Sequence, residues 1–206
     1  MPFIRVHDCN ILFVHIPRTG GTTVEHWMRG LGDLKLFSYS TPRFSKITPQ
    51  HLRYADICEL LGDGYFDYSF AIVRNPFDRL ASEYRLHALQ AQKNGIWKGA
   101  PRFSTWLENK LDSYSKNSWA EDNHIRPQWE FLSKAVKVFK YEDGVLTALA
   151  EVARQIGVPA PAEIGHELAT SDVDAKAIFD IPDVERAVAF YARDFEHLGY
   201  SKTPHM

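Results

Sequence analysis

ILFVHIPRTGGTT, residues 11–23, is the most informative stretch of this chain for its fold. Its first part is apolar and rich in β-branched residues, as in a buried strand, and that run stops at Pro17. An arginine, two glycines and two threonines follow before a helical pattern of apolar residues begins at Val24. A strand, a tight loop and a helix N-terminus together bind anions well, because the first N–H groups and the dipole of the helix face the loop. We therefore expect a phosphate or sulfate group to lie against Arg18, Thr19, Gly20, Gly21, Thr22 and Thr23.

The loop differs from a Walker A motif, in which a lysine and a hydroxyl residue follow the second glycine. Here the cation, Arg18, precedes the glycine pair, and no lysine follows that pair in the loop. A structural interpretation also stays open, in which the two glycines form a turn and Thr22 or Thr23 caps the helix.

A second strand-to-helix junction lies at residues 70–84 (FAIVRNPFDRLASEY). Asn75 suits a helix N-cap, and Pro76 suits the first helical position. Arg74 thus falls at the carboxyl end of a strand, where open α/β sheets bind ligands. Ser82 lies two turns along the helix, on roughly the same face as Asn75. We therefore expect Arg74 and Ser82 to bind one anion together.

Taken together, the two junctions resemble the donor-binding motifs of the sulfotransferases. Residues 15–22 (HIPRTGGT) are similar to that family's 5′-phosphosulfate-binding loop, and residues 74–84 are similar to its 3′-phosphate-binding segment. The resemblance is closest to the carbohydrate sulfotransferase group that includes the heparan sulfate 2-O-sulfotransferases and many bacterial relatives. It implies a P-loop-NTPase-like α/β fold of three layers, with helices on both faces of a mainly parallel sheet. It also implies the donor 3′-phosphoadenosine-5′-phosphosulfate (PAPS), which leaves adenosine 3′,5′-bisphosphate after transfer.

Further segments extend the resemblance over nearly the whole chain, from residue 11 to residue 200. They are residues 49–54 (PQHLRY), 123–132 (NHIRPQWEFL), 138–143 (VFKYED) and 190–200 (FYARDFEHLGY). Two features depart from the family. Arg18 stands where the loop usually carries lysine, and residues 165–171 lack the asparagine that relatives often have there.

Sulfuryl transfer needs a group that accepts the proton of the attacking hydroxyl. His51 is the first candidate, because residues 49–54 resemble the stretch with the catalytic histidine of the 2-O-sulfotransferases and because imidazole titrates in the useful range. A surface histidine at a helix start is the alternative. His124 is the second candidate, with an alternative role in holding the Pro–Gln segment. Arg18 is expected to stabilise charge on the leaving phosphate oxygen.

Three residues near the loop have other interpretations. Glu25 and His26 are a third possibility for the base, although helix direction carries at least one of them away from the donor. His15 lies inside the first predicted strand, so we expect it to shape the loop.

Other charged residues have ordinary interpretations. Arg79 and Glu83 are four residues apart, which allows an ion pair on a helix surface. Asp122 and His124, near Glu121, could be metal ligands, but they lack the paired spacing of a metal site. No metal is expected.

Composition agrees with one catalytic domain over residues 1–206. At 206 residues and 45% hydrophobic content the chain can bury one good core. Its net charge of −2 argues against a general nucleic-acid binder, and Cys9 and Cys58 read as reduced thiols. The sequence shows no signal-peptide pattern and no apolar window of the roughly 20 residues needed for a membrane span. We therefore expect a cytoplasmic, bacterial-type enzyme.

The predicted order starts with strand, helix, short strand, helix, strand and helix, and continues with a helical middle. A strand at residues 135–141 and helices at 144–156 and 182–198 follow, which predicts a mainly parallel sheet. The leading function is PAPS-dependent transfer to a hydroxyl, with a carbohydrate acceptor implied by the resemblance. A Mg²⁺-dependent nucleotide phosphotransferase and a non-catalytic nucleotide-binding module are the alternatives. Trp97, Trp119 and Trp129 are expected either to stack on sugar rings or to pack in the core.

Overall fold

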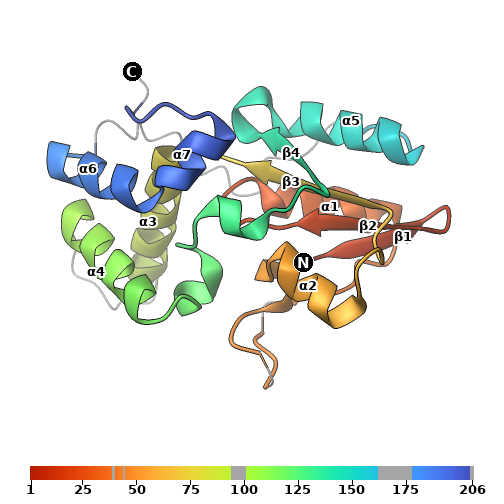
Figure 1. The fold of residues 1–206 in the computed structure, drawn as a ribbon, viewed down its shortest axis with the longest axis horizontal. Helices are drawn as coiled ribbons and strands as arrows, with labels where there is room; N and C mark the ends of the chain where they lie inside the picture. Colours follow the sequence, from red (N-terminus) through yellow and green to blue (C-terminus); the bar gives the residue numbers. More distant parts are fainter. Residues whose placement is uncertain (39, 44, 94–100, 162–177, 205–206) are drawn as a thin grey trace. The chain divides into compact units, whose positions relative to one another are not determined.

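The fold is a mixture of α-helices and β-strands (Figure 1), seen in a computed structural model that describes residues 1–38, 40–43, 45–93, 101–161 and 178–204. Contacts between residues divide the chain into two compact units. The first unit comprises Met1–Arg74 and Glu130–Glu167, and the second comprises Asn75–Trp129 and Leu168–Met206. That residues 1–206 act as one domain stays a prediction.

The first unit contains a four-stranded sheet in the order β1-β2-β3-β4. The strands are β1 (Phe3–Val6), β2 (Cys9–Val14), β3 (Tyr68–Val73) and β4 (Val136–Lys140). β2, β3 and β4 are parallel, in a register that places Phe13 beside Phe70 and Ala71 beside Val138. β1 was not predicted; it forms an antiparallel hairpin with β2. The prediction of a mainly parallel sheet is therefore confirmed.

Two helices of the first unit, α1 (Gly21–Leu31) and α5 (Val145–Ile156), pack against the sheet through one hydrophobic cluster. Side chains alternate along a strand, so β2 and β3 contribute every second residue to this cluster. Its buried members include Ile11, Phe13, Val24, Trp27, Met28, Phe70, Ile72, Leu149 and Val152. The 3₁₀ turns η1 (Pro49–His51) and η4 (Tyr141–Asp143) and the helix α2 (Tyr54–Leu61) complete the unit.

The second unit is helical. Its helices are α3 (Pro76–Lys93), α4 (Phe103–Lys116), α6 (Ile181–Phe190) and α7 (Ala192–Leu198), with the short turn η2 (Ala120–Asn123). They share a second cluster, whose fully or nearly buried members include Phe77, Leu80, Trp106, Leu107, Ala187, Tyr191 and Phe195. Each unit thus has a hydrophobic core of its own.

Asp194 of α7 binds a distant segment of the second unit through hydrogen bonds. Its carboxylate is fully buried and accepts the backbone N–H groups of Gln128 and Trp129, both at 2.9 Å. Gln128 begins the short turn η3 (Gln128–Phe131). Burial raises the pKa of Asp194, although the two N–H groups act in the opposite direction. The segment that ends in Pro–Gln is therefore held by a residue close to the C-terminus.

The structure differs from the sequence-based expectation in three elements. The predicted helix at 182–198 is divided into α6 and α7 at Tyr191, whose buried hydroxyl donates to the carbonyl oxygen of Ile125 at 2.7 Å. The short strand expected after α1 is reduced to a single bridge between Phe3 and Lys35 in the part of the chain that the structure describes. α1 begins at Gly21, earlier than the apolar pattern indicated.

Trp97 and residues 165–171 lie outside the described residues. No described helix has the length and apolar character to cross a bilayer.

Candidate active site

The loop between β2 and α1 turns sharply and leads directly into a helix N-terminus. Arg18 and Gly20 have φ angles of 68° and 88°, which turn the chain sharply before α1 begins at Gly21. The first N–H groups of a helix generally lack an acceptor within the helix and can donate to an anion, but those of Thr23 and Val24 already donate to the carbonyl oxygen of Gly20. A Cβ atom on Gly20 would lie 3.0 Å from Cγ2 of Val145, so the loop also passes close to α5.

The cap of α1 differs from the structural interpretation of the loop. Gly20 is the N-cap residue, and the N–H groups of Thr23 and Val24 donate to its carbonyl oxygen at 3.1 and 3.3 Å. Neither Thr22 nor Thr23 is therefore the cap. Thr19 is fully buried, and its hydroxyl donates to the carbonyl oxygen of Ile16 at 2.8 Å, which holds the loop together from inside.

Arg74 is brought to this loop from the end of β3, as the sequence predicted. Its guanidinium donates to the carbonyl oxygen of Arg18 at 3.4 Å and lies 4.4 Å from the ring centroid of Tyr141. Tyr141 in turn borders the loop, because its Cε2 lies 3.3 Å from the position of a Cβ on Gly20. A cation and an aromatic ring from two strand ends thus stand beside the anion loop.

Asn75 and Ser82, the other predicted residues of this junction, belong to the second unit. The prediction of Asn75 as N-cap is confirmed, since its side-chain oxygen accepts the N–H of Phe77 at 2.9 Å at the start of α3. Ser82 is buried on α3. Its role in anion binding stays a prediction.

Behind the loop lies a buried pair of titratable residues. Nδ1 of His15 is 2.6 Å from a carboxylate oxygen of Glu25, and the side chains are only 9% and 5% exposed. A Cβ on Gly21 would fall 1.9 Å from Nε2 of His15, so the ring occupies the space that a side chain at that position would need. Sequence reasoning expected His15 to shape the loop, and this packing confirms it. The pairing with Glu25 was missed, because a spacing of ten residues across a strand, loop and helix has no recognisable pattern.

His51 lies next to this pair. Its ring meets the ring of His15 edge-on, with centroids 5.0 Å apart and an interplanar angle of 78°. Nδ1 of His51 is 3.4 Å from the hydroxyl oxygen of Thr48. With 4% of its surface exposed, His51 is buried, so the alternative of an ordinary surface histidine is wrong.

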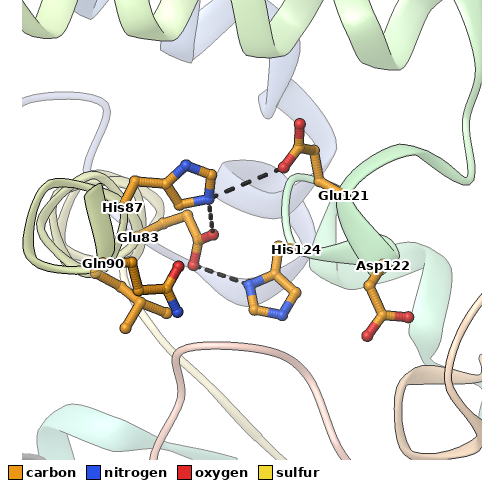
Figure 2. Close-up of a pocket in the computed structure, with 7 residues that line it drawn as sticks. Glu83, His87, Gln90, Glu121, Asp122 and His124 are labelled. Atoms are coloured by element: carbon orange, nitrogen blue, oxygen red, sulfur yellow. Dashed lines mark hydrogen bonds and ion pairs between the residues drawn. The ribbon is translucent and has the colours of Figure 1, made fainter. Parts of the chain in front are cut away.

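In the second unit, His124 borders a small cavity of about 290 Å³ (Figure 2). The cavity is lined by Glu83, Leu86, His87 and Gln90 of α3 and by Glu121, Asp122 and His124. Figure 2 shows Glu83 between two imidazole rings: Nδ1 of His124 at 2.9 Å and Nε2 of His87 at 3.1 Å. Arg79 and Glu83 were expected to form an ion pair on the helix surface. The predicted surface position is wrong, because both side chains are buried.

The charge of Glu83 is strongly stabilised by its surroundings. Burial by itself raises the pKa of this carboxyl group, but the charges and hydrogen bonds of His124 and His87 outweigh it and hold the pKa well below the ordinary value. Glu83 is therefore an ionised acceptor at the back of the cavity. The i, i+4 spacing of Glu83 and His87 was the one signal in the sequence that could have indicated part of this cluster.

The loop that carries His124 has an unusual backbone. Glu121, Asp122 and Asn123 have φ angles of 56°, 51° and 65°, a left-handed conformation that residues other than glycine adopt at some cost. Arg79 supports the far side of this loop by donating to the carbonyl oxygens of His124 and Arg126 at 2.7 and 3.0 Å. His124 is thus positioned from both its side chain and its backbone.

A family model described as the sulfotransferase family matches residues 1–201 of the chain. The match includes the loop after β2, the junction at Arg74 and the segments with His51 and His124. Searches of curated proteins and of solved structures found no match.

Proposed function

Because the chain belongs to the sulfotransferase family, we propose that it transfers a sulfuryl group from PAPS to a hydroxyl group of a carbohydrate acceptor. The family establishes sulfuryl transfer in general. The donor and the acceptor are our inference. The observation that carries the donor is the convergence of Arg74 and Tyr141 on the glycine loop at the start of α1.

The proposed donor site uses the loop as a cradle for the 5′-phosphosulfate. Arg18, Thr19, Gly20, Gly21, Thr22 and Thr23 supply the cradle, in which backbone N–H groups face the phosphate. Arg74 supplies a planar cation that can donate two hydrogen bonds to a phosphate oxygen pair, and the resemblance assigns it with Ser82 to the 3′-phosphate. Arg18 keeps the positive charge that a lysine usually provides in this loop, so it is the residue we assign to the leaving oxygen.

In the proposed reaction, the acceptor oxygen attacks the sulfur atom while the bond between sulfur and the bridging phosphate oxygen breaks. The hydroxyl proton moves to His51, and adenosine 3′,5′-bisphosphate leaves. The protein contributes mainly position and charge stabilisation, as in phosphoryl transfer. Burial of His51 against His15, in the unit that carries the donor loop, supports His51 over His124 as the base.

The carbohydrate acceptor rests on the resemblance of residues 49–54 and 123–132 to carbohydrate sulfotransferases. Trp119 and Trp129, two candidates for stacking on sugar rings, already face arginines. The guanidinium of Arg126 lies 5.0 Å from the Trp119 ring, and that of Arg193 lies 4.6 Å from the Trp129 ring. These contacts favour packing over sugar stacking for both tryptophans.

Calorimetric titration with adenosine 3′,5′-bisphosphate tests the donor class directly. The same protein is titrated with ADP and with ATP, each without metal, and with ATP again in the presence of Mg²⁺. We expect tight binding that depends on the 3′-phosphate and that weakens about tenfold or more in Arg74→Ala and in Arg18→Ala, because each loses a charged hydrogen-bonding group. Arg154→Ala removes an exposed arginine of α5 that pairs with Glu151, and serves as the matched control.

The alternative functions make different predictions in that experiment. A phosphotransferase would bind ATP in the presence of Mg²⁺ and would ignore the 3′-phosphate, which would overturn the proposal. A non-catalytic module would bind the bisphosphate but would form none of it from PAPS with any sugar in an acceptor screen.

A further inference from the structure

We propose that Glu25 and His15 form a buried positioning pair for His51, so that the candidate base is oriented by two residues behind it. The inference rests on the proposed function, because it takes His51 as the group that removes the acceptor proton. Neither Glu25 nor His15 is assigned a contact with substrate.

Glu25 occupies a position in α1 where a carboxylate needs a partner. It lies on the face of α1 that enters the hydrophobic core, next to Val24 and in line with Met28, both of which are fully buried. A carboxylate in such a place is strongly unfavourable unless it has a partner. Its partner is Nδ1 of His15 at 2.6 Å, so the pair holds the proton of His15 on Nδ1 and turns Nε2 to the opposite side.

The ring of His15 is held in place by its packing. On one side it stacks on Phe13, with centroids 5.3 Å apart and an interplanar angle of 22°. Nε2 of His15 lies 1.9 Å from the position that a Cβ on Gly21 would occupy. Glu25, Phe13 and Gly21 together leave the ring one orientation, which ties it to the first residue of α1.

The ring of His15 in turn contacts the ring of His51. His51 ends a 3₁₀ turn of three residues, and its Nδ1 and Nε2 lie 3.4 Å from the Thr48 hydroxyl oxygen and 3.4 Å from the Gln50 amide nitrogen. Both contacts are longer than a usual hydrogen bond and fix the ring poorly by themselves. The edge of one imidazole against the face of the other, 5.0 Å between centroids, restricts the orientation of His51 from the side of the donor loop. In enzymes the base is commonly oriented by a third group through a hydrogen bond, and here the packing of the His15 ring takes that role.

The carboxylate also has an electrostatic effect. When His51 accepts the proton of the acceptor hydroxyl, it becomes an imidazolium ion. The negative charge of Glu25, one ring away, favours that ion, because a buried setting screens the attraction between opposite charges less than bulk water does. The proton stays on His51 and does not pass to His15 or Glu25.

The first test is spectroscopic and needs no substrate. Long-range ¹H–¹⁵N correlation spectra of histidine-labelled protein report which ring nitrogen is protonated, and His15→Gln and His51→Gln assign the signals. We expect His15 protonated on Nδ1 in the wild-type protein, and a change in the ring signals of both His15 and His51 in Glu25→Gln. Glu59→Gln, the same chemical change at an exposed position of α2, should leave both unchanged. An unprotonated Nδ1 of His15 in the wild type, or unchanged His51 signals in Glu25→Gln, would overturn the proposal.

The second test separates positioning from a general structural effect. A positioned base contributes about 10²- to 10⁴-fold, so we expect Glu25→Gln to lower kcat for bisphosphate formation from PAPS by at least about tenfold. KM for PAPS should change less than about twofold, because the loop residues that bind it are intact. In a His51→Ala background the same Glu25→Gln change should have no further effect, since a positioning residue acts only through the group it positions. Equal losses in both backgrounds would contradict the proposal.

The two tests keep this inference distinct from the proposed function. If the wild-type protein neither binds adenosine 3′,5′-bisphosphate nor forms it from PAPS, the proposed function fails. The spectra still decide whether Glu25 and His15 orient His51.

Discussion

Glu25 with His15 and Glu83 with His124 both pair a buried carboxylate with an imidazole, one pair in each unit, with N···O distances of 2.6 and 2.9 Å. The first pair is closed: its imidazole is 9% exposed and lies between Phe13, Gly21 and His51. The second is open: His124 is 22% exposed, borders a cavity and shares Glu83 with His87. The same chemical pair therefore serves two purposes here. In the closed pair it fixes a neighbouring side chain, and in the open pair it presents an imidazole to whatever enters the cavity.

Replacing His51 and His124, the two candidate bases, should give the largest difference in turnover between the two sites. We expect His51→Ala to lower the turnover of PAPS by about 10²- to 10⁴-fold and to leave adenosine 3′,5′-bisphosphate binding within about twofold, because it removes the base and not the donor site. His124→Ala should cost less in turnover. Steady-state kinetics with calorimetry on both variants measures the two effects. A larger loss of turnover in His124→Ala would make the open pair the catalytic one.

Removal of the two carboxylates compares the pairs by stability. Glu83→Ala leaves two half-buried imidazoles without this acceptor, so we expect the free energy of unfolding to fall by about 3 kcal/mol or more. Glu25→Ala leaves one, and we expect a smaller loss of about 2 kcal/mol. Urea unfolding followed by circular dichroism gives both values. Equal losses would mean that His87 adds nothing to the open pair.

A methyl group at Gly21 tests how closed the first pair is. Gly21→Ala places a Cβ within 1.9 Å of the His15 ring, which is held by Glu25 and Phe13. We expect a loss of about 2 kcal/mol in unfolding free energy from this overpacking. Gly30→Ala, on the same helix with nothing within 4 Å of its added Cβ, should instead stabilise the protein by about 0.5–1 kcal/mol. If both variants unfold alike, the His15 ring can move and the pair is less closed than its packing indicates.

Lowering the pH should reduce the free energy of unfolding by less than these substitutions do, because protonation of Glu83 leaves its side chain in place. The pKa of Glu83 is lower in the folded protein than its ordinary value of 4.5, so the folded state holds the ionised form more strongly than the unfolded chain does. The resulting stabilisation is present above pH 4.5 and is lost as the pH falls through the lowered pKa. Unfolding measured from pH 7 down to pH 3 should therefore show a steeper loss of stability in the wild type than in Glu83→Gln. Parallel curves would contradict this.

Local patterns in the sequence predicted the parts of the site that depend on neighbouring residues. The glycine loop, the N-cap at Asn75 and the place of Arg74 at the end of β3 follow from strand, turn and helix signals within a few residues. These signals are local, so they can be read without knowing the tertiary structure. The alternative in which a threonine caps α1 is wrong, because the N-cap is Gly20 in a left-handed conformation.

The features that the sequence did not predict depend on contacts between distant residues. Glu83 and His124 are separated by 41 positions, and no spacing rule relates them. The break at Tyr191 was missed because an unbroken apolar pattern continues across it, while the hydrogen bond to Ile125 that marks the break comes from 66 positions away. β1 is the local exception: its hairpin with β2 turns at His7 and Asp8, which lack the Asn-Gly or Asp-Gly signal of such turns.

The bond of Asp194 to the backbone of Gln128 has a consequence for synthesis. The carboxylate that satisfies this N–H group is added to the chain 66 residues later. At ordinary translation speeds of 5–20 residues per second, the ribosome needs roughly 3–13 s to deliver it. During that interval the backbone N–H group of Gln128 does not yet have the Asp194 carboxylate as its acceptor. A nascent chain that ends before residue 194 therefore meets the cell's chaperones and proteases without this carboxylate. Its helical unit is then incomplete, even though the residues of the donor loop have already been synthesised.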